Sequence, residues 1–189
     1  MPDKKPDSHT LRALLVRLLD GLERVHNSGL LHRSIKPENI VVTAEGKPVL
    51  IDFGSPLKAL DPSAEIGSEW PKAVNAYDPH EFFVTGSKQG PSADLYSLAA
   101  CFYHLICGTT PADCQHRMSA MLSQRPDPYI PLGNLTDEFD EAFCKTIDGA
   151  LAILPRHRMR SARQWRETLS EKIPQQNQPQ PRRYALTNT

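Results

Sequence analysis

The segments Leu31-His32-Arg33-Ser34-Ile35-Lys36-Pro37-Glu38-Asn39 and Asp52-Phe53-Gly54 decide how this chain is expected to fold. Between them lie two short apolar runs, residues 40–42 and 49–51, separated by a Glu-Gly pair. Two β-favouring runs joined by a Gly-containing turn predict a β-hairpin. Such a hairpin would bring the end of the first segment and the start of the second to neighbouring strand ends.

The region before the first segment has the pattern of a long amphipathic helix. Asp7 or Ser8 is placed to cap its start, and Gly29 to close its end after Asn27. We therefore expect a helix over residues 8–27 that packs on one face. Its apolar residues recur at helical spacing, at Leu11, Leu14, Leu15, Leu18, Leu22 and Val25.

The region after the second segment begins with a long loop and continues as helices. Residues 55–91 are rich in Pro, Gly, Ser and Asp, which predicts a surface segment with a helical piece near Glu81-Phe82-Phe83. Residues 92–107 are apolar at nearly every position, which predicts a central helix that ends at Gly108. The expected fold class is mainly α with one small β-hairpin.

Three shorter helices are expected towards the C-terminus. Residues 116–124 suit a short exposed helix. Thr136 is placed to cap a second helix and Ser161 a third. The predicted inward residues are Phe139, Phe143, Ile147, Ala150 and Leu151 in the second helix, and Trp165 and Leu169 in the third.

Composition bounds the kinds of protein this can be. A chain of 189 residues suits one domain with a hydrophobic core, preceded by a loose lead-in at residues 1–7. Its 22 basic residues balance its 22 acidic ones, which gives no long-range attraction to nucleic acid or acidic membranes. No apolar run is long enough to span a bilayer, and no signal peptide begins the sequence. We therefore expect a cytoplasmic protein with neither nucleic acid nor membrane as a partner.

The tail and the cysteines carry weaker signals. Residues 174–189 are rich in Gln and Pro, cannot bury apolar surface and are expected to be disordered. Cys101, His104 and Cys107 lie three apart and are compatible with a metal site. The absence of a C-x-x-C pair and of four converging ligands favours buried small hydrophobic residues instead.

With the loop, the hairpin and the triplet in place, the chain resembles the protein kinase family. Residues 32–39 resemble the catalytic loop His-Arg-Asp-x-x-x-x-Asn, and residues 52–54 resemble the Asp-Phe-Gly triplet. Ala76-Tyr77-Asp78-Pro79-His80-Glu81 resembles the end of an activation segment (residues 52–81) in the variant common in bacterial Ser/Thr kinases. The resemblance covers residues 8–173 and implies the C-terminal lobe of a kinase.

The resemblance assigns a role to each matching residue. His32 and Arg33 open the catalytic loop, and Lys36 is implied to contact the γ-phosphate of ATP. Asn39 and Asp52 are implied to be the magnesium ligands, and their hard oxygen atoms suit Mg²⁺. Three further residues are implied to be structural: Asp94 anchors the backbone of the catalytic loop, and Arg158 pairs with Glu81 at the end of the activation segment. Gly54 belongs with the ATP-binding residues as the last residue of the triplet.

Two departures put catalysis in question. Ser34 stands where the family keeps the aspartate that accepts the substrate proton. A serine hydroxyl is a very poor base, and losing a positioned base typically removes roughly 10²–10⁴ in rate. The sequence also lacks a Gly-rich phosphate loop and the lysine of the N-terminal lobe, so one wall of the ATP site is expected to be missing.

Three hypotheses follow for the function. The preferred one is a catalytically impaired, pseudokinase-like lobe that works as a binding or scaffold module through its exposed interlobe face. The alternative is an active Ser/Thr protein kinase whose N-terminal lobe is supplied separately, and ATP and Mg²⁺ would then be its cofactors. The third is a truncated gene product without function. The partner expected in the first two cases is an N-terminal lobe, or a protein that covers the same face.

Overall fold

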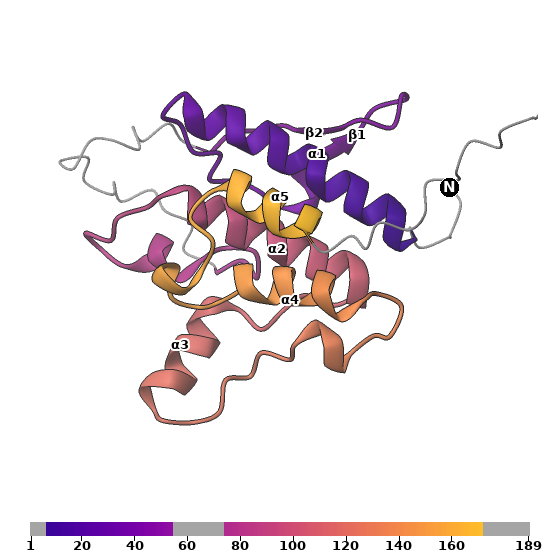
Figure 1. The fold of residues 1–189 in the computed structure, drawn as a ribbon. Coiled ribbons are helices and arrows are strands. Elements are labelled where there is room, and N and C mark those ends of the chain that lie inside the picture. Colours follow the sequence, from indigo (N-terminus) through magenta and orange to yellow (C-terminus); the bar gives the residue numbers. More distant parts are fainter. Residues whose placement is uncertain (1–6, 55–73, 172–189) are drawn as a thin grey trace, which may run out of the picture.

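The computed structural model describes residues 7–54 and 74–171. Helices α1, α2 and α4 and the β1–β2 hairpin surround one core, and α3 lies at the opposite end of the molecule from α1 (Figure 1). This arrangement confirms the mainly α fold class with a single hairpin. The elements are α1 Ser8–Asn27, η1 Pro37–Asn39, β1 Ile40–Val42, β2 Pro48–Leu50, η2 His80–Phe83, α2 Pro91–Cys107, α3 Cys114–Leu122, η3 Leu132–Asn134, α4 Glu141–Ala150, η4 Pro155–His157 and α5 Ala162–Glu171.

Helix α1 has the predicted bounds and caps. The Asp7 carboxylate accepts a hydrogen bond from the backbone N–H of Thr10 at 2.7 Å, and Gly29 follows the helix with a φ of 78°. Glycine suits this left-handed position because it has no Cβ. The buried stripe differs from the predicted one at three positions, since Leu19 is fully buried whereas Leu14 and Val25 are partly exposed.

Helix α2 is the centre of the molecule. Its residues are buried on nearly all sides, as the continuous apolar run predicts. It packs against α1 on one side and α4 on another, and α5 closes the gap between α1 and α4 (Figure 1). Gly108 ends α2 in the left-handed conformation at a φ of 75°. Because α2 is buried so completely, any polar side chain on it must find a partner inside the protein.

The hairpin is short but well defined. β1 and β2 pair antiparallel, with Ile40 opposite Leu50 and Val42 opposite Pro48. The turn uses Gly46 at a φ of 71°. Beyond the paired residues, the N–H of Ile51 donates to the carbonyl of Asn39 at 3.0 Å. The hairpin thus fixes the spacing between the two segments that flank it.

Two expectations for the C-terminal helices need correction. Asp140, not Thr136, caps α4: its carboxylate accepts from the N–H of Phe143 at 2.9 Å and pairs with Arg12. The Thr136 hydroxyl instead accepts from the N–H of Glu138 in the preceding turn. Helix α3 begins two residues earlier than predicted and is not simply exposed, because it buries Cys114, Arg117 and Ala120.

The predicted start and inward residues of the last helix, α5, are confirmed. The Ser161 hydroxyl accepts from the N–H of Gln164 at the start of α5, and Trp165 and Leu169 point inward. The lead-in before Asp7, residues 55–73 and the tail from residue 172 lie outside the described residues. Within the described ranges, no helix is both long enough and apolar enough to cross a membrane.

One buried ion pair ties the end of the activation segment to the C-terminal helices. The guanidinium of Arg158 donates to both carboxylate oxygens of Glu81, at 2.7 and 3.1 Å, and to the carbonyls of Ala152 and Ile153. Both side chains are at most 1% exposed. The pair therefore joins η2 to the segment after α4.

Replacing Arg158 by alanine should lower the free energy of unfolding by about 3–5 kcal/mol, because it leaves the Glu81 carboxylate buried without its counter-charge. Urea denaturation followed by circular dichroism measures this. The matched control is Lys145→Ala, which removes an exposed pair with Glu141 and should leave the midpoint nearly unchanged. A loss no larger than that of the control would contradict the anchoring role.

Candidate active site

The site is organised from the core outward by Asp94. This carboxylate on α2 is fully buried and accepts hydrogen bonds from the backbone N–H groups of His32 and Arg33, both at 2.8 Å. Its third partner is the ring of His26 on α1, whose Nε2 lies 2.8 Å from the carboxylate. The two backbone bonds fix the start of the loop against the central helix, and the His26 contact ties α1 to the same carboxylate.

The loop is held in a conformation that costs energy. Arg33 has a φ of 61° and Asp52 a φ of 53°, both in the left-handed region that disfavours residues with a Cβ. Each such residue typically costs on the order of 1–3 kcal/mol and persists only where neighbours impose it. The bonds to Asp94 supply that constraint at Arg33.

The two segments contact each other directly. The N–H of Gly54 donates to the carbonyl of His32 at 2.8 Å, and the rings of His32 and Phe53 lie 4.3 Å apart. The His32 side chain is buried, and this burial lowers the pKa of the imidazole against the opposing influence of Asp94. The hairpin therefore brings the two segments together as the sequence predicts.

Asn39 joins Ser34 to Asp52 at the centre of the site. Its amide nitrogen lies 2.8 Å from the Ser34 carbonyl, 2.9 Å from the Ser34 hydroxyl and 3.5 Å from the Asp52 carbonyl. Asn39 is buried, whereas Asp52 is exposed. Because the nitrogen faces these acceptors, the amide oxygen is the atom of Asn39 that remains for a cation.

The activation-segment end forms a second wall beside Lys36. The Tyr77 hydroxyl lies 2.6 Å from Nδ1 of His104, and the N–H of Tyr77 donates to the Asn75 side chain. Asp78 directly follows Tyr77 in the chain, so the two contacts of Tyr77 also position Asp78. Its burial raises the pKa of the carboxyl to about 6, opposed by a hydrogen bond to the Asn75 backbone and by the charge of Lys36.

The comparisons with known proteins agree with this geometry. A sequence profile described as the protein kinase domain matches residues 3–171. The chain belongs to the protein kinase family. Residues 32–39 and 52–54, which approach each other closely, both lie within the matched region.

The similar proteins include bacterial Ser/Thr kinases of which this chain covers only a part. It is 30% identical over 168 residues to the serine/threonine-protein kinase PknA of Nostoc sp., covering 84% of this chain and 28% of PknA. It is 36% identical over 135 residues to the probable serine/threonine-protein kinase PkwA of Thermomonospora curvata. That match covers 70% of this chain and 17% of PkwA. It is 31% identical over 138 residues to the serine/threonine-protein kinase PknL of Mycobacterium tuberculosis. That match covers 70% of this chain and 34% of PknL.

A solved structure supports the fold as well. The apo form of PpkA-294 superposes on this chain with a TM-score of 0.67 and 27% sequence identity, over 86% of this chain and 54% of that one. The chain described here thus spans about half of that solved chain and about a third or less of the three curated relatives.

The kinase lobe retains oxygen atoms that suit the family's magnesium ions. The Asn39 amide oxygen and the Asp52 carboxylate are hard ligands at neighbouring strand ends, which is the donor set Mg²⁺ prefers. A metal ion held by these oxygen atoms would neutralise charge on a bound phosphate group, and Lys36 lies on the same loop as Asn39. Ser34 offers no carboxylate at the place where the acceptor proton would go.

The structure adds residues that sequence reasoning missed. His26 lies six residues before His32 on α1, and only the tertiary fold shows that it contacts Asp94. Asp78 and His104 likewise gain roles only because η2 packs near α2. The possible metal trio is not formed: His104 contacts Tyr77, and burial of Cys101 raises the pKa of its thiol. Across the described residues, no group of three or more His, Cys, Asp and Glu is placed to hold a metal.

Replacing Gly54 by alanine should destabilise the lobe by roughly 1–3 kcal/mol, the usual cost of forcing an extra methyl group into a packed site. A Cβ at this position would lie 3.1 Å from the Arg33 Cβ and 3.3 Å from its carbonyl carbon. The thermal midpoint measures the change. The matched control is Gly149→Ala in α4, where a Cβ meets nothing within 4 Å. That control should stabilise the lobe by roughly 0.5–1 kcal/mol, and a Gly54 variant that behaves like it would contradict the close approach.

Proposed function

We propose that this kinase lobe is catalytically impaired and acts as a pseudokinase-like binding or scaffold module. The observation that carries the proposal is the use of Ser34. Its hydroxyl oxygen accepts from the Asn39 amide at 2.9 Å, so Ser34 is held in the site. A serine hydroxyl is a very poor base at neutral pH, so it cannot take the place of a carboxylate that accepts a proton. The site keeps the groups that bind and orient but lacks the group that removes the acceptor proton.

The binding surface in this proposal is the interlobe face on the hairpin side. Phe53 and Val42 are 52% and 54% exposed, and Leu30, Val41 and Val49 are between 43% and 48% exposed. Exposed apolar side chains of this kind suit an interaction surface. The partner proposed for this face is an N-terminal kinase lobe or a protein that covers the same residues.

A second candidate function is an active Ser/Thr protein kinase completed by an N-terminal lobe. The intact set of Lys36, Asn39, Asp52 and Asp94 favours it, since these residues bind phosphate and metal or hold the loop in shape. The relatives named above are Ser/Thr protein kinases. ATP and Mg²⁺ are the proposed cofactors in this case.

Titration of the chain with ATP, with and without Mg²⁺, tests whether this side of the site binds nucleotide alone. We expect no binding up to millimolar ATP by calorimetry, because a ligand with only one wall buries little of its surface. Circular dichroism of the same sample confirms that the chain is folded. Magnesium-dependent binding in the micromolar range that Asp52→Ala abolishes would instead favour the active-kinase alternative.

Restoring the carboxylate tests the chemical step itself. The chain is fused to the N-terminal lobe of the Nostoc PknA, and transfer of labelled phosphate from ATP to a basic protein mixture is measured. We expect Ser34→Asp to exceed the unchanged fusion by about 10²–10⁴ in rate, because it returns a positioned base.

The matched control for that experiment is Ser34→Ala, which should be as slow as the unchanged fusion. Equal and measurable rates of transfer for the unchanged fusion and Ser34→Asp would show that the serine is not the lesion and would overturn the proposal. A folded fusion that transfers nothing with either residue would rule out the active-kinase alternative.

A further inference from the structure

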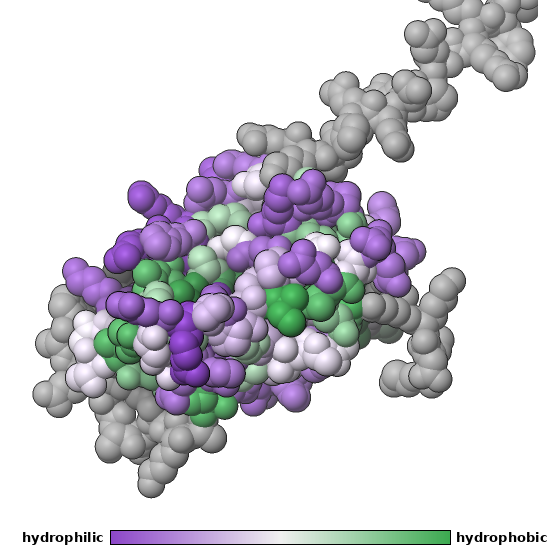
Figure 2. Space-filling view, turned by 90° about the horizontal axis from the view of Figure 1, so that it is seen from below, coloured by the Kyte–Doolittle hydropathy of each residue, from purple (hydrophilic) through white to green (hydrophobic). Residues whose placement is uncertain are grey.

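A hollow of about 490 Å³ lies between η2 and α3. Phe83 and Val84 line it on the η2 side, and Met118 and Leu122 line it on the α3 side. Leu122 is 77% exposed, and apolar side chains reach the surface among polar ones at this end of the molecule (Figure 2). Because side chains that line a hollow lack contacts on one side, packing across it fixes the position of α3 only weakly. The contacts on the inner side of α3 therefore decide where this helix lies.

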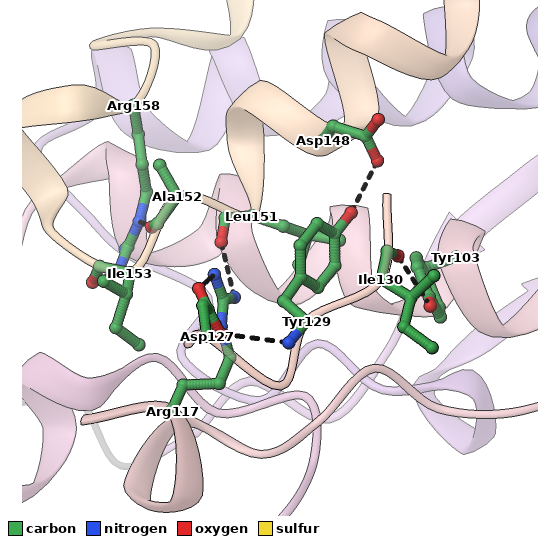
Figure 3. A network of polar contacts seen from close by, with 10 residues as sticks. All are labelled: Tyr103, Arg117, Asp127, Tyr129, Ile130, Asp148, Leu151, Ala152, Ile153 and Arg158. Atoms are coloured by element: carbon green, nitrogen blue, oxygen red, sulfur yellow. Dashed lines mark hydrogen bonds and ion pairs between the residues drawn. The ribbon is translucent and has the colours of Figure 1, made fainter. Parts of the chain in front are cut away.

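Arg117 is a buried polar residue on the inner side of α3, with a side chain that is 4% exposed. Its guanidinium donates to the carboxylate of Asp127 at 2.9 and 3.0 Å and to the carbonyl of Leu151 at 2.7 Å (Figure 3). It also lies 4.5 Å from the centre of the Tyr129 ring. Asp127 and Tyr129 belong to the connection that follows α3, whereas Leu151 directly follows α4. Arg117 thus ties α3 to the end of α4.

Arg158 binds the next two carbonyls of the same segment. Its guanidinium donates to Ala152 at 2.6 Å and to Ile153 at 2.7 Å, and the two arginines approach the segment from different elements (Figure 3). The same guanidinium donates to both carboxylate oxygens of Glu81 in η2. Residues 151–153 therefore present three consecutive carbonyls to two buried cations, one linked to α3 and the other to η2.

The segment between the two arginines is itself held firmly. Leu151 is fully buried, and its N–H donates to the carbonyls of Ile147 and Asp148 in the last turn of α4. The Asp148 carboxylate in turn accepts from the N–H of Leu132 at 3.0 Å and from the Tyr129 hydroxyl at 2.5 Å. Close-packed protein interiors have low compressibility and transmit strain. A shift at one arginine is therefore expected to reach the other through this segment.

We infer that residues 151–153 couple α3 to η2, so that a displacement of α3 loosens the end of the activation segment. The connection runs from Arg117 through the three carbonyls to Arg158 and Glu81. Because η2 begins two residues after Asp78, the coupling gives the candidate site a point of control at α3. This coupling is independent of the proposed function, since none of its residues belongs to the catalytic loop.

Hydrogen exchange of the full chain, followed by mass spectrometry, tests the coupling. Arg117→Lys keeps the buried charge but loses the planar fork that binds Asp127 and Leu151 together. Exchange in residues 114–122 and in residues 77–84 should both become roughly 5–30-fold faster, because one opening would then break the same weakened bonds in both segments.

Three comparisons make the result specific. Residues 95–106 of α2 report unfolding of the whole fold and should exchange more slowly than both segments in the unchanged chain. Arg125→Lys, the same substitution at an exposed position just beyond α3, should change the exchange of neither segment. Because coupling between two sites is reciprocal, Glu81→Gln should in turn speed exchange in residues 114–122.

An Arg117→Lys variant in which exchange speeds up in residues 114–122 but not in residues 77–84 would overturn the inference, because α3 would then open by itself. Equal exchange of both segments and of residues 95–106 in the unchanged chain would overturn it too, since η2 and α3 would then open only when the whole fold unfolds. A Glu81→Gln variant that leaves exchange in residues 114–122 unchanged would contradict the coupling from the other direction.

Discussion

The buried carboxylate of Asp94 is the constraint on which the rest of the site depends. It lies on the most completely buried helix of the fold, where an unpaired charge would cost several kcal/mol. Its partners are backbone groups of His32 and Arg33 and the ring of His26. The buried carboxylate therefore keeps its hydrogen bonds only when the loop adopts this one shape. The left-handed backbone of Arg33, and through it the close approach of Gly54, follow from that requirement.

The dependence of the loop on Asp94 explains how a kinase lobe can keep its shape when the residue at position 34 is a serine. Asp94, Glu81 and Arg158 act on the backbone and on packing, and they are indifferent to the side chain at position 34. Ser34 fits the loop because its hydroxyl and carbonyl both accept from the Asn39 amide. In the proposed function, an ordered site that presents Lys36, Asn39 and Asp52 without a carboxylate at position 34 would serve for binding.

The two ends of the molecule offer different surfaces. The interlobe face carries exposed side chains on the hairpin and next to the site, and its proposed partner is another lobe. The hollow beside α3 lies next to the end of the activation segment. Glu81 belongs to η2 and is fixed there by Arg158, so it holds the end of the activation segment against the C-terminal helices.

The sequence by itself determined the helices whose apolar residues recur at helical spacing, the hairpin with its Gly46 turn, and the pairing of residues 32–39 with residues 52–54. It did so because periodicity, glycine in left-handed positions and a short connection are local properties. It misplaced the cap of α4, since Asp140 and Thr136 are equally good caps until the loop before them is folded. Only the tertiary structure decided that His26 supports Asp94, that Asp78 faces Lys36 and that α3 and η2 enclose a hollow, because these contacts join residues far apart in the chain.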